Sequence, residues 1–144
     1  MRLWHYELLP YLPKSQLLSQ KRECDLIIKT MWNKGEKVNH ILINYIYEYA
    51  DISFTMYYTL LYQEFKKRNF KFNDTFRKVN TLLLDNKFAP FTRHHNNTCL
   101  LVCFMNLYEK YKAKQKDFDK DTFNKLYDFV NTRFDLENLG ITKE

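Results

Sequence analysis

Glycine and proline are scarce in this chain, whose 144 residues include two Gly and three Pro. All-β proteins need these residues for their many tight turns, so the scarcity argues against a sandwich or barrel. Long apolar runs are missing too. The nearest, residues 41–62, is interrupted by Asn44, Glu48 and Asp51, so we expect no membrane span. The amino terminus lacks the basic-then-apolar pattern of a signal peptide, and we expect a soluble, cytoplasmic protein.

Cofactor and metal chemistry have little support in the residue pattern. The three cysteines show no paired spacing, which suits reduced thiols. Cys99 and Cys103, four residues apart, could share a metal, but buried free thiols on an apolar helix face are commoner. His94 and His95 are adjacent, so on a helix they would diverge by about 100°. We expect no metal and no cofactor.

Positive charge is concentrated in one block of the chain. Residues 66–116 hold twelve Lys or Arg against three Asp or Glu, a net charge of +9, whereas the whole chain carries +6. Such a block is typical of a surface that binds nucleic-acid phosphates. A solvated basic face in a protein of high isoelectric point is the alternative. With 45% hydrophobic and 17% aromatic residues, the chain can fill a real core.

Apolar residues recur at helical spacing along most of the chain. Phe54, Tyr57, Tyr58, Leu61 and Phe65 share one face of a helix over 52–69. This face is either core or, less expectedly, a platform for stacked bases. Further helices are expected over about 13–33, ending at Lys34-Gly35, and over 75–86, 97–115 and beyond a cap at Asp119. Residues 38–50 predict a helix or a strand, and 87–95 a loop.

These patterns predict an all-α fold, a compact single-domain helical bundle over residues 1–144. Pro10 and Pro13 exclude an early α-helix, so residues 1–12 are expected to form an extended amino-terminal arm. Residues 135–144 are expected to form a frayed tail. We expect a monomer.

The amino terminus offers a candidate nucleophile. α-Amines ordinarily have pKa values of about 7.7–8.0, against about 10.4 for lysine, so a useful fraction is unprotonated near neutral pH. Arg2 is large and prevents removal of the initiator, so the reactive group would be the amine of Met1. Every protein has an amino terminus, however, and only the neighbours distinguish this one.

Arg22 and Glu23 are candidate neighbours, since both fall on the polar flanks of the first expected helix. A carboxylate can stabilise a cationic sugar intermediate or take the proton that β-elimination releases. Arginines bind flanking phosphates. The alternative is an exposed helical ion pair, which stabilises a protein by less than about 1 kcal/mol.

Residues 1–24, together with the segments 35–38 and 66–75, resemble the pyrimidine-dimer DNA glycosylase family of phage endonuclease V. The opening Met1-Arg2-Leu3-Trp4-His5 resembles a bacterial branch of it more closely. The resemblance implies a helical bundle whose amino-terminal arm lies between helices. It also implies a free amine that attacks deoxyribose C1′ of a flipped-out nucleotide, forming an imine, and a helix-1 glutamate that assists strand cleavage.

Transferred by position, the resemblance makes Met1 and Glu23 the catalytic residues of a DNA glycosylase with AP-lyase activity on double-stranded DNA. It assigns phosphate contacts to Arg2 and Arg22. The expected DNA-binding residues are Arg2, Arg22, Trp4, His5, Lys66, Lys67, Arg68, Arg93, Lys110, Lys112 and Lys114.

Two departures from the family pattern stand out. The phage enzyme exposes a small first residue, whereas this chain keeps Met1, and an acidic helical extension replaces the aromatic, basic tail of the family. Trp4 would then be a wedge or an anchor to the core, and His5 a proton carrier or phosphate donor. The rival hypotheses are a non-catalytic nucleic-acid-binding module of the same fold and an interaction protein that uses the aromatic segment 41–65.

Overall fold

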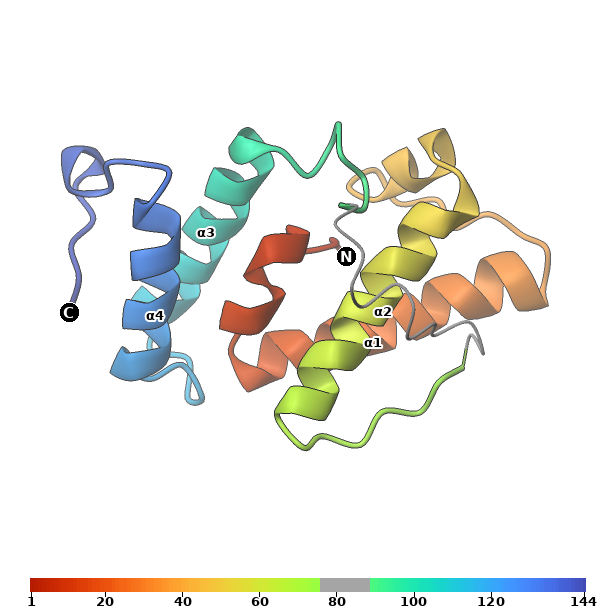
Figure 1. Ribbon diagram of the computed structural model, residues 1–144, viewed down its shortest axis with the longest axis horizontal. Helices are drawn as coiled ribbons and strands as arrows, with labels where there is room; N and C mark the ends of the chain where they lie inside the picture. The colour runs from red at the N-terminus through yellow and green to blue at the C-terminus, as the bar shows by residue number, and fades with distance from the viewer. Residues whose placement is uncertain (76–88) are drawn as a thin grey trace.

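The computed structural model of the protein describes residues 1–75 and 89–144. In these ranges every regular element is helical (Figure 1), which confirms the all-α fold class. The expected helix over 75–86, with Val79, Leu82 and Leu83, lies, except for Thr75, outside the described residues. The elements are η1 (Tyr6–Tyr11), α1 (Lys14–Ile28), η2 (Lys29–Asn33), η3 (Asn44–Glu48), α2 (Asp51–Lys67), α3 (Asn97–Lys112), α4 (Lys120–Asn131) and η5 (Glu137–Leu139).

The first expected helix is present, but its last turn is a π-helix and not an α-helix. α1 starts directly after Pro13, whose carbonyl accepts the first helical hydrogen bond, from the Leu17 amide at 3.1 Å. The helix widens into the single π turn η2, and Gly35 then adopts a left-handed φ of +67°. A residue without Cβ takes this conformation at little cost, so the chain turns away here as predicted.

Two later helices begin at caps that the sequence makes plain. The side chain of Asn96 accepts a hydrogen bond from the Cys99 amide at 2.9 Å, at the start of α3. Asp119 accepts one from the Thr122 amide at 2.8 Å, at the start of α4. Each bond satisfies an amide that has no partner within the helix. The cap predicted at Asp119 is thereby confirmed.

We had expected the amino-terminal arm to be extended, but part of it is helical. Residues Tyr6–Tyr11 coil into the 3-10 helix η1, which is capped by His5 and buries Leu8 and Leu9. Prolines exclude α-helix here but permit a short 3-10 turn, and the two buried leucines stabilise it. η1 lies between the α1–α2 pair and the α3–α4 pair (Figure 1) and contacts α2 and α4. The arm thus lies between helices, as the resemblance implied.

The segment 38–50 forms neither the helix nor the strand that its composition suggested. It forms a turn followed by the short 3-10 helix η3. The Tyr45 and Tyr49 hydroxyls bond to His95 and His94 instead, at 2.7 and 2.6 Å. These contacts to a segment distant in sequence decide the local structure, and no periodicity records them.

The carboxy-terminal tail is anchored, where we had expected residues 135–144 to fray. Leu136 and Ile141 are buried. The Ile141 amide donates to the Leu136 carbonyl at 2.9 Å, and the Tyr127 hydroxyl donates to the Ile141 carbonyl at 3.3 Å. These two buried side chains and the bond to Tyr127 hold the tail against α4.

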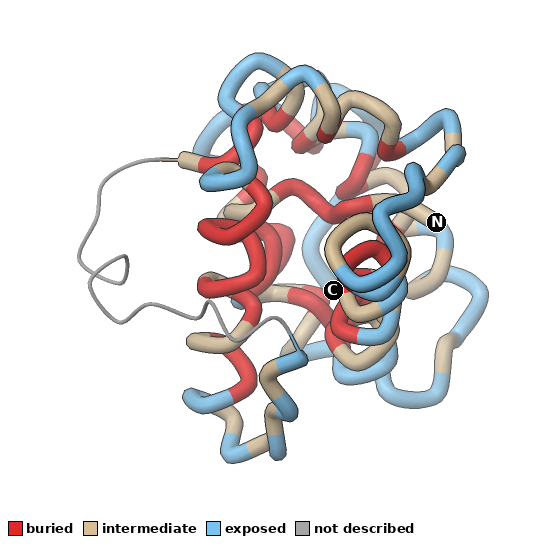
Figure 2. Tube along the Cα trace, turned by 90° about the vertical axis from the view of Figure 1, so that its right-hand side faces the viewer, coloured by how far each residue is buried: buried red, intermediate tan, exposed pale blue. Residues whose placement is uncertain are grey.

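One continuous core joins all the described helices except η5, which has no buried residue. Figure 2 shows the buried stretches gathered in the interior, with the amino terminus at the edge of the molecule. None of the helices in the described ranges has the length and apolar character that crossing a membrane requires. The core therefore fixes the helices around the arm, while the terminal amine stays accessible.

Candidate active site at the amino terminus

A shallow surface pocket of about 360 Å³ surrounds the amino terminus. Its walls come from the arm, from α1, from the turn before η3 and from α3. The lining residues are Met1, Arg2, Trp4, Gln16, Ser19, Glu23, Leu42 and Lys110. The pocket thus unites the predicted nucleophile, the predicted carboxylate and two cations predicted to bind DNA, Arg2 and Lys110. Met1 and Lys110 lie 109 positions apart in the sequence.

The α-amine of Met1 faces a histidine that the sequence did not single out. Its nitrogen lies 3.3 Å from Nε2 of His40. The other ring nitrogen of His40, Nδ1, is buried and finds no hydrogen-bond partner among the described residues. The amine is therefore held by one side chain that can exchange a proton with it.

Glu23 points into the same pocket from α1. Its carboxylate accepts a hydrogen bond from Gln20 Nε2 at 3.1 Å. Burial raises the pKa of the Glu23 carboxyl, and the positive charge of the Met1 amine opposes this effect. A carboxyl with a raised pKa is better suited to take up and release protons than an exposed glutamate.

Gln20 fixes the position of the arm on α1. Its Oε1 accepts from the Trp4 amide at 2.8 Å and from the Tyr57 hydroxyl at 2.9 Å. Its Nε2 donates to the Arg2 carbonyl at 3.0 Å as well as to Glu23. Each amide atom of this fully buried side chain thus has two partners. Since Glu23 follows one turn later on the same helix face, the same contacts bring the terminal amine beside it.

Positive charge surrounds the single carboxylate. Arg2 and Lys110 line the pocket with the amine itself, and the Arg2 guanidinium lies 5.5 Å from the centre of the Trp4 ring. Arg22 is exposed at the rim, where its Nη2 donates to Ser19 Oγ at 3.0 Å. Cationic side chains around a nucleophile suit a phosphate-bearing substrate.

The comparison with known families decides the identity. The model of a family described as pyrimidine dimer DNA glycosylase matches residues 1–78, more than half of the chain. The chain belongs to this family. No curated protein matches the chain, and no solved structure does.

Membership of the pyrimidine dimer DNA glycosylase family makes this a DNA-repair protein with DNA as its substrate. The matched residues include Met1, Gln20, Glu23 and His40, whereas Lys110 lies beyond them. Most of the pocket therefore falls in the part of the chain that carries the family pattern.

Trp4 and His5 are less available than the sequence suggested. Trp4 is 7% exposed and packs into the core, which favours the anchor over the wedge. His5 is 1% exposed, and its Nδ1 accepts from the Glu7 amide at 3.1 Å. Burial lowers the pKa of His5 and favours the neutral ring. Contact with a DNA phosphate requires an accessible ring, whereas the His5 imidazole is buried.

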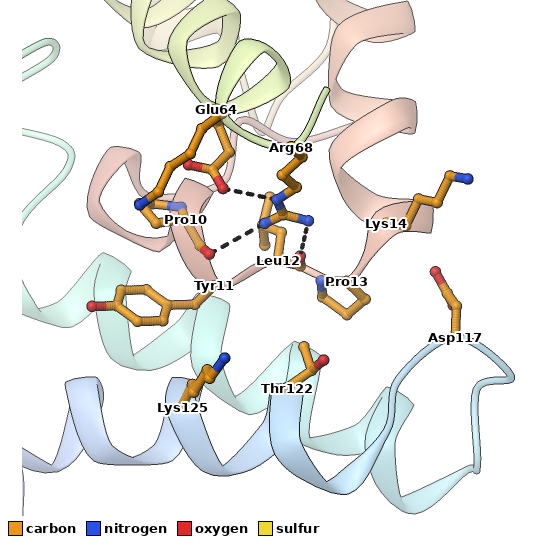
Figure 3. Close-up of a pocket in the computed structure, with 11 residues that line it drawn as sticks. Pro10, Tyr11, Leu12, Pro13, Lys14, Glu64, Arg68, Asp117, Thr122 and Lys125 are labelled. Carbon is orange, nitrogen blue, oxygen red and sulfur yellow. Dashed lines mark hydrogen bonds and ion pairs between the residues drawn. The ribbon is translucent and has the colours of Figure 1, made fainter. Parts of the chain in front are cut away.

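Arg68 also serves a structural role, in a larger hollow of about 580 Å³ away from the amine (Figure 3). It pairs with Glu64 at 2.8 Å and donates to the carbonyls of Leu12, Leu9 and Pro10 at 2.9, 3.3 and 3.2 Å. These bonds tie the end of α2 to the arm. Arg68 is thus committed to the protein, whereas Lys66 and Lys67 beside it are exposed.

The remaining predicted contacts lie outside the pocket. Arg93 is exposed, with its guanidinium 5.0 Å from the centre of the Tyr49 ring and a hydrogen bond to the Glu48 carbonyl. Lys112 and Lys114 follow Lys110 at the end of α3, around a second hollow. The structure therefore brings only Lys110 from this lysine run to the amine.

In the described ranges no three His, Cys, Asp or Glu side chains are grouped to hold a metal ion. The Sγ atoms of Cys99 and Cys103 lie 4.0 Å apart on α3 as free thiols. Sequence reasoning missed Gln20 and His40. Gln20 carried a usable signal, because it lies one helical turn before Glu23 on the same face. His40 carried none.

Proposed function

We propose that the protein is a DNA glycosylase with AP-lyase activity on double-stranded DNA that carries pyrimidine-dimer-like or abasic damage. The observation that carries this proposal is the convergence of the Met1 amine, Glu23, Arg2 and Lys110 in one open pocket. A nucleophile, an acid–base group and phosphate-binding cations are the parts that the reaction needs. We propose that the protein acts as a monomer in the cytoplasm.

The proposed reaction begins when a damaged nucleotide leaves the base stack. The lone pair of the Met1 nitrogen forms a bond to C1′, and the glycosidic bond breaks with its electron pair leaving on the base. The nitrogen then loses a proton, and the C1′–O4′ bond opens to a protonated imine with a hydroxyl at O4′. Removal of a C2′ proton expels the 3′ phosphate, and water finally releases the amine.

Glu23 is the group assigned to the proton transfers. Its carboxyl has a raised pKa and lies beside the site where the cationic imine forms. The negative charge stabilises that cation, and the oxygens can receive the C2′ proton. Arg2 and Lys110 hold the flanking phosphates, and Arg22 extends the contact at the rim.

The deciding experiment is borohydride trapping on duplex DNA with one abasic site, using protein with its native amino terminus. Borohydride reduces the imine to a stable covalent adduct. We expect an adduct with the free amine and none after the amine is acetylated. DNA binding without an adduct would instead identify a non-catalytic binding module, and salt-sensitive affinity would then be its main property.

The substitution Glu23→Gln tests the role of the carboxylate. We expect DNA affinity within a factor of about two and strand cleavage reduced by roughly 10²- to 10⁴-fold, since acid–base groups contribute on this scale. Single-turnover cleavage of abasic duplex measures the effect. Glu36→Gln is the matched control, because Glu36 is exposed and lies outside the pocket. Unchanged cleavage by Glu23→Gln would remove this residue from the mechanism.

A further inference from the structure

The turn between α1 and η3 brings His40 to the amino terminus, where Nε2 lies 3.3 Å from the Met1 nitrogen. We infer that His40 is a catalytic residue that takes the proton from the Met1 ammonium group and so generates the nucleophile. This inference rests on the proposed function, since it concerns the same amine. It adds a general base that is separate from Glu23.

The amine needs such a base because an ammonium nitrogen has no lone pair with which to attack C1′. The neighbouring Glu23 carboxylate interacts favourably with the ammonium charge. Nε2 of His40, in hydrogen-bond contact with the amine, can accept this proton. Proton transfer to it leaves an uncharged amine in an unchanged position.

Because Nδ1 of His40 has no hydrogen-bond partner among the described residues, Nε2 can act either as a proton acceptor or as a proton donor. The tautomer of a histidine is usually set by the hydrogen bond that its second nitrogen makes. Nδ1 of His40 is buried and makes none within residues 1–75 and 89–144. Neither tautomer therefore loses a bond, so Nε2 can accept from the ammonium or donate to the free amine.

The backbone of the turn holds the His40 ring in place. The His40 amide donates to Asn44 Oδ1 at 2.8 Å, and its carbonyl accepts from the Ile43 and Asn44 amides, both at 2.9 Å. Ile43 is fully buried and anchors the turn in the core. The imidazole thus approaches the amine from a fixed element.

The charged groups around this contact come from three elements. Glu23 is on α1, Arg2 and the Met1 amine are on the arm, and Lys110 is on α3. In the transfer, one N–H bond of the ammonium breaks and an Nε2–H bond forms. The positive charge moves to His40, where the Glu23 carboxylate still interacts with it. The imidazolium can then return its proton to O4′ as the sugar ring opens.

Borohydride trapping of His40→Gln and His40→Ala at several pH values tests the inference. We expect both variants to bind abasic duplex normally and to trap up to about tenfold more slowly near pH 7. The defect should shrink as the pH rises through about 8 and vanish above about pH 9, where an α-amine has lost its proton without help. Glu36→Gln, a change at an exposed residue outside the pocket, is the matched control.

Two outcomes would overturn the role of His40. Wild-type rates in both variants would show that the ring is dispensable, and a defect of equal size at every pH would reduce it to a positioning residue. Glutamine keeps a polar side chain at the contact, so a folding failure confined to His40→Ala still leaves the test in force. Absence of an adduct with the wild-type protein would contradict the proposed function instead.

The two residues after His40 support a second, independent inference. Ile41 is 87% exposed and Leu42 is 49% exposed, although both are large and apolar. Leu42 also lines the pocket of the amine. They form an exposed apolar tip beside the pocket that holds the Met1 amine, Glu23 and Arg2.

We propose that this tip enters the base stack of duplex DNA when the damaged nucleotide leaves it. A flipped nucleotide leaves a gap between base pairs, and inserted apolar side chains fill such gaps and stabilise the distorted duplex. The tip lies next to the group that attacks the flipped sugar, as a wedge must. Trp4, the wedge suggested by the sequence, is too deeply buried for this task.

The test uses duplex DNA with 2-aminopurine beside an abasic site, at saturating protein. Unstacking raises the fluorescence of this base. We expect a rise with the wild-type protein and with Ile52→Ser, a matched change at a residue 51% exposed on α2. We expect little rise with Ile41→Ser/Leu42→Ser, whose trapping on duplex should fall roughly tenfold. An undiminished rise in the double variant would overturn the wedge, whether or not the wild-type protein forms an adduct.

Discussion

Among single side chains, Gln20 has the greatest influence on where the amine lies. Its amide group satisfies the Trp4 amide, the Arg2 carbonyl and the Tyr57 hydroxyl together. A buried polar group that loses its partner costs about 1–3 kcal/mol. Gln20 therefore connects two properties, the stability of the arm and the geometry of the nucleophile.

The substitution Gln20→Leu should separate these properties from DNA affinity. We expect unfolding in urea to show a loss of about 2–4 kcal/mol, because two or more buried groups lose a partner. Trapping of abasic DNA should fall more than DNA binding does, since the amine loses its fixed position. Gln63→Leu on α2 is the control. Wild-type stability in Gln20→Leu would mean that water replaces the lost contacts.

Arg68 and Lys67 are neighbours with opposite expected roles. Arg68→Ala removes four hydrogen bonds and leaves the Glu64 carboxylate, which is 7% exposed, without its cation. We expect a loss of about 2–4 kcal/mol in urea unfolding. Lys67→Ala should leave stability within about 0.5 kcal/mol and can change only DNA affinity and its salt dependence. Equal stabilities of the two variants would contradict the structural role of Arg68.

Between elements, the ion pair of Glu7 and Arg133 joins η1 to the end of α4. Both guanidinium Nη atoms donate to the carboxylate, one at 2.7 Å. Arg133 lowers the pKa of Glu7 through this bond. The ion pair thus joins two elements whose residues lie 126 positions apart in the sequence.

The pair is partly exposed, with side-chain exposures of 32% and 25%, so its contribution is modest. A double-mutant cycle with Glu7→Gln and Arg133→Gln should give a coupling of about 0.5–1 kcal/mol, reduced by salt. The lowered pKa means that this stabilisation is present above the ordinary pKa of glutamate and is lost as the pH falls further. Lys143 and Asp128, a more exposed pair, should show a smaller coupling. A larger coupling there would refute this ranking.

Most helices could be predicted because their signals are local. The apolar stripe of α2 and the Asp119 cap of α4 each depend only on residues that are close together in the sequence. The π turn after α1 and the 3-10 helices η1 and η3 could not be predicted. They depend on contacts with distant partners, such as the one between Tyr45 and His95. Because these partners are far apart in the chain, the spacing of apolar residues cannot predict the contacts between them.

For the molecule as a whole, two buried histidines couple stability to pH. Burial lowers the pKa of His95 to about 3 and also lowers that of His5, which stacks on it with ring centroids 5.4 Å apart. The unfolded chain binds these protons near pH 6.5, and the folded chain does not. The contribution of these two neutral histidines to the free energy of unfolding is therefore fully present above about pH 6.5 and is lost as the pH falls toward 3.

Urea unfolding at pH 7 and pH 5 should show this loss directly. We expect His95 to account for about 2 kcal/mol between these values. His95→Phe should be less stable at pH 7, since Tyr6 and Tyr45 lose a partner, but it should depend less on pH. Glu36→Gln, at an exposed residue, is the control. A pH dependence in His95→Phe as steep as in the wild-type protein would assign the effect to other groups.

The sequence by itself determined the helical class, the Asp119 cap, the basic block and the family to which the chain belongs. It also supplied Met1 and Glu23 as candidates, because a resemblance over consecutive residues is local information. Only the tertiary structure decided which cations reach the amine, that His5 is buried and Arg68 is bonded to the arm, and that His40 meets Met1. These outcomes depend on how separate helices pack around the buried arm, and packing is a property of the whole chain.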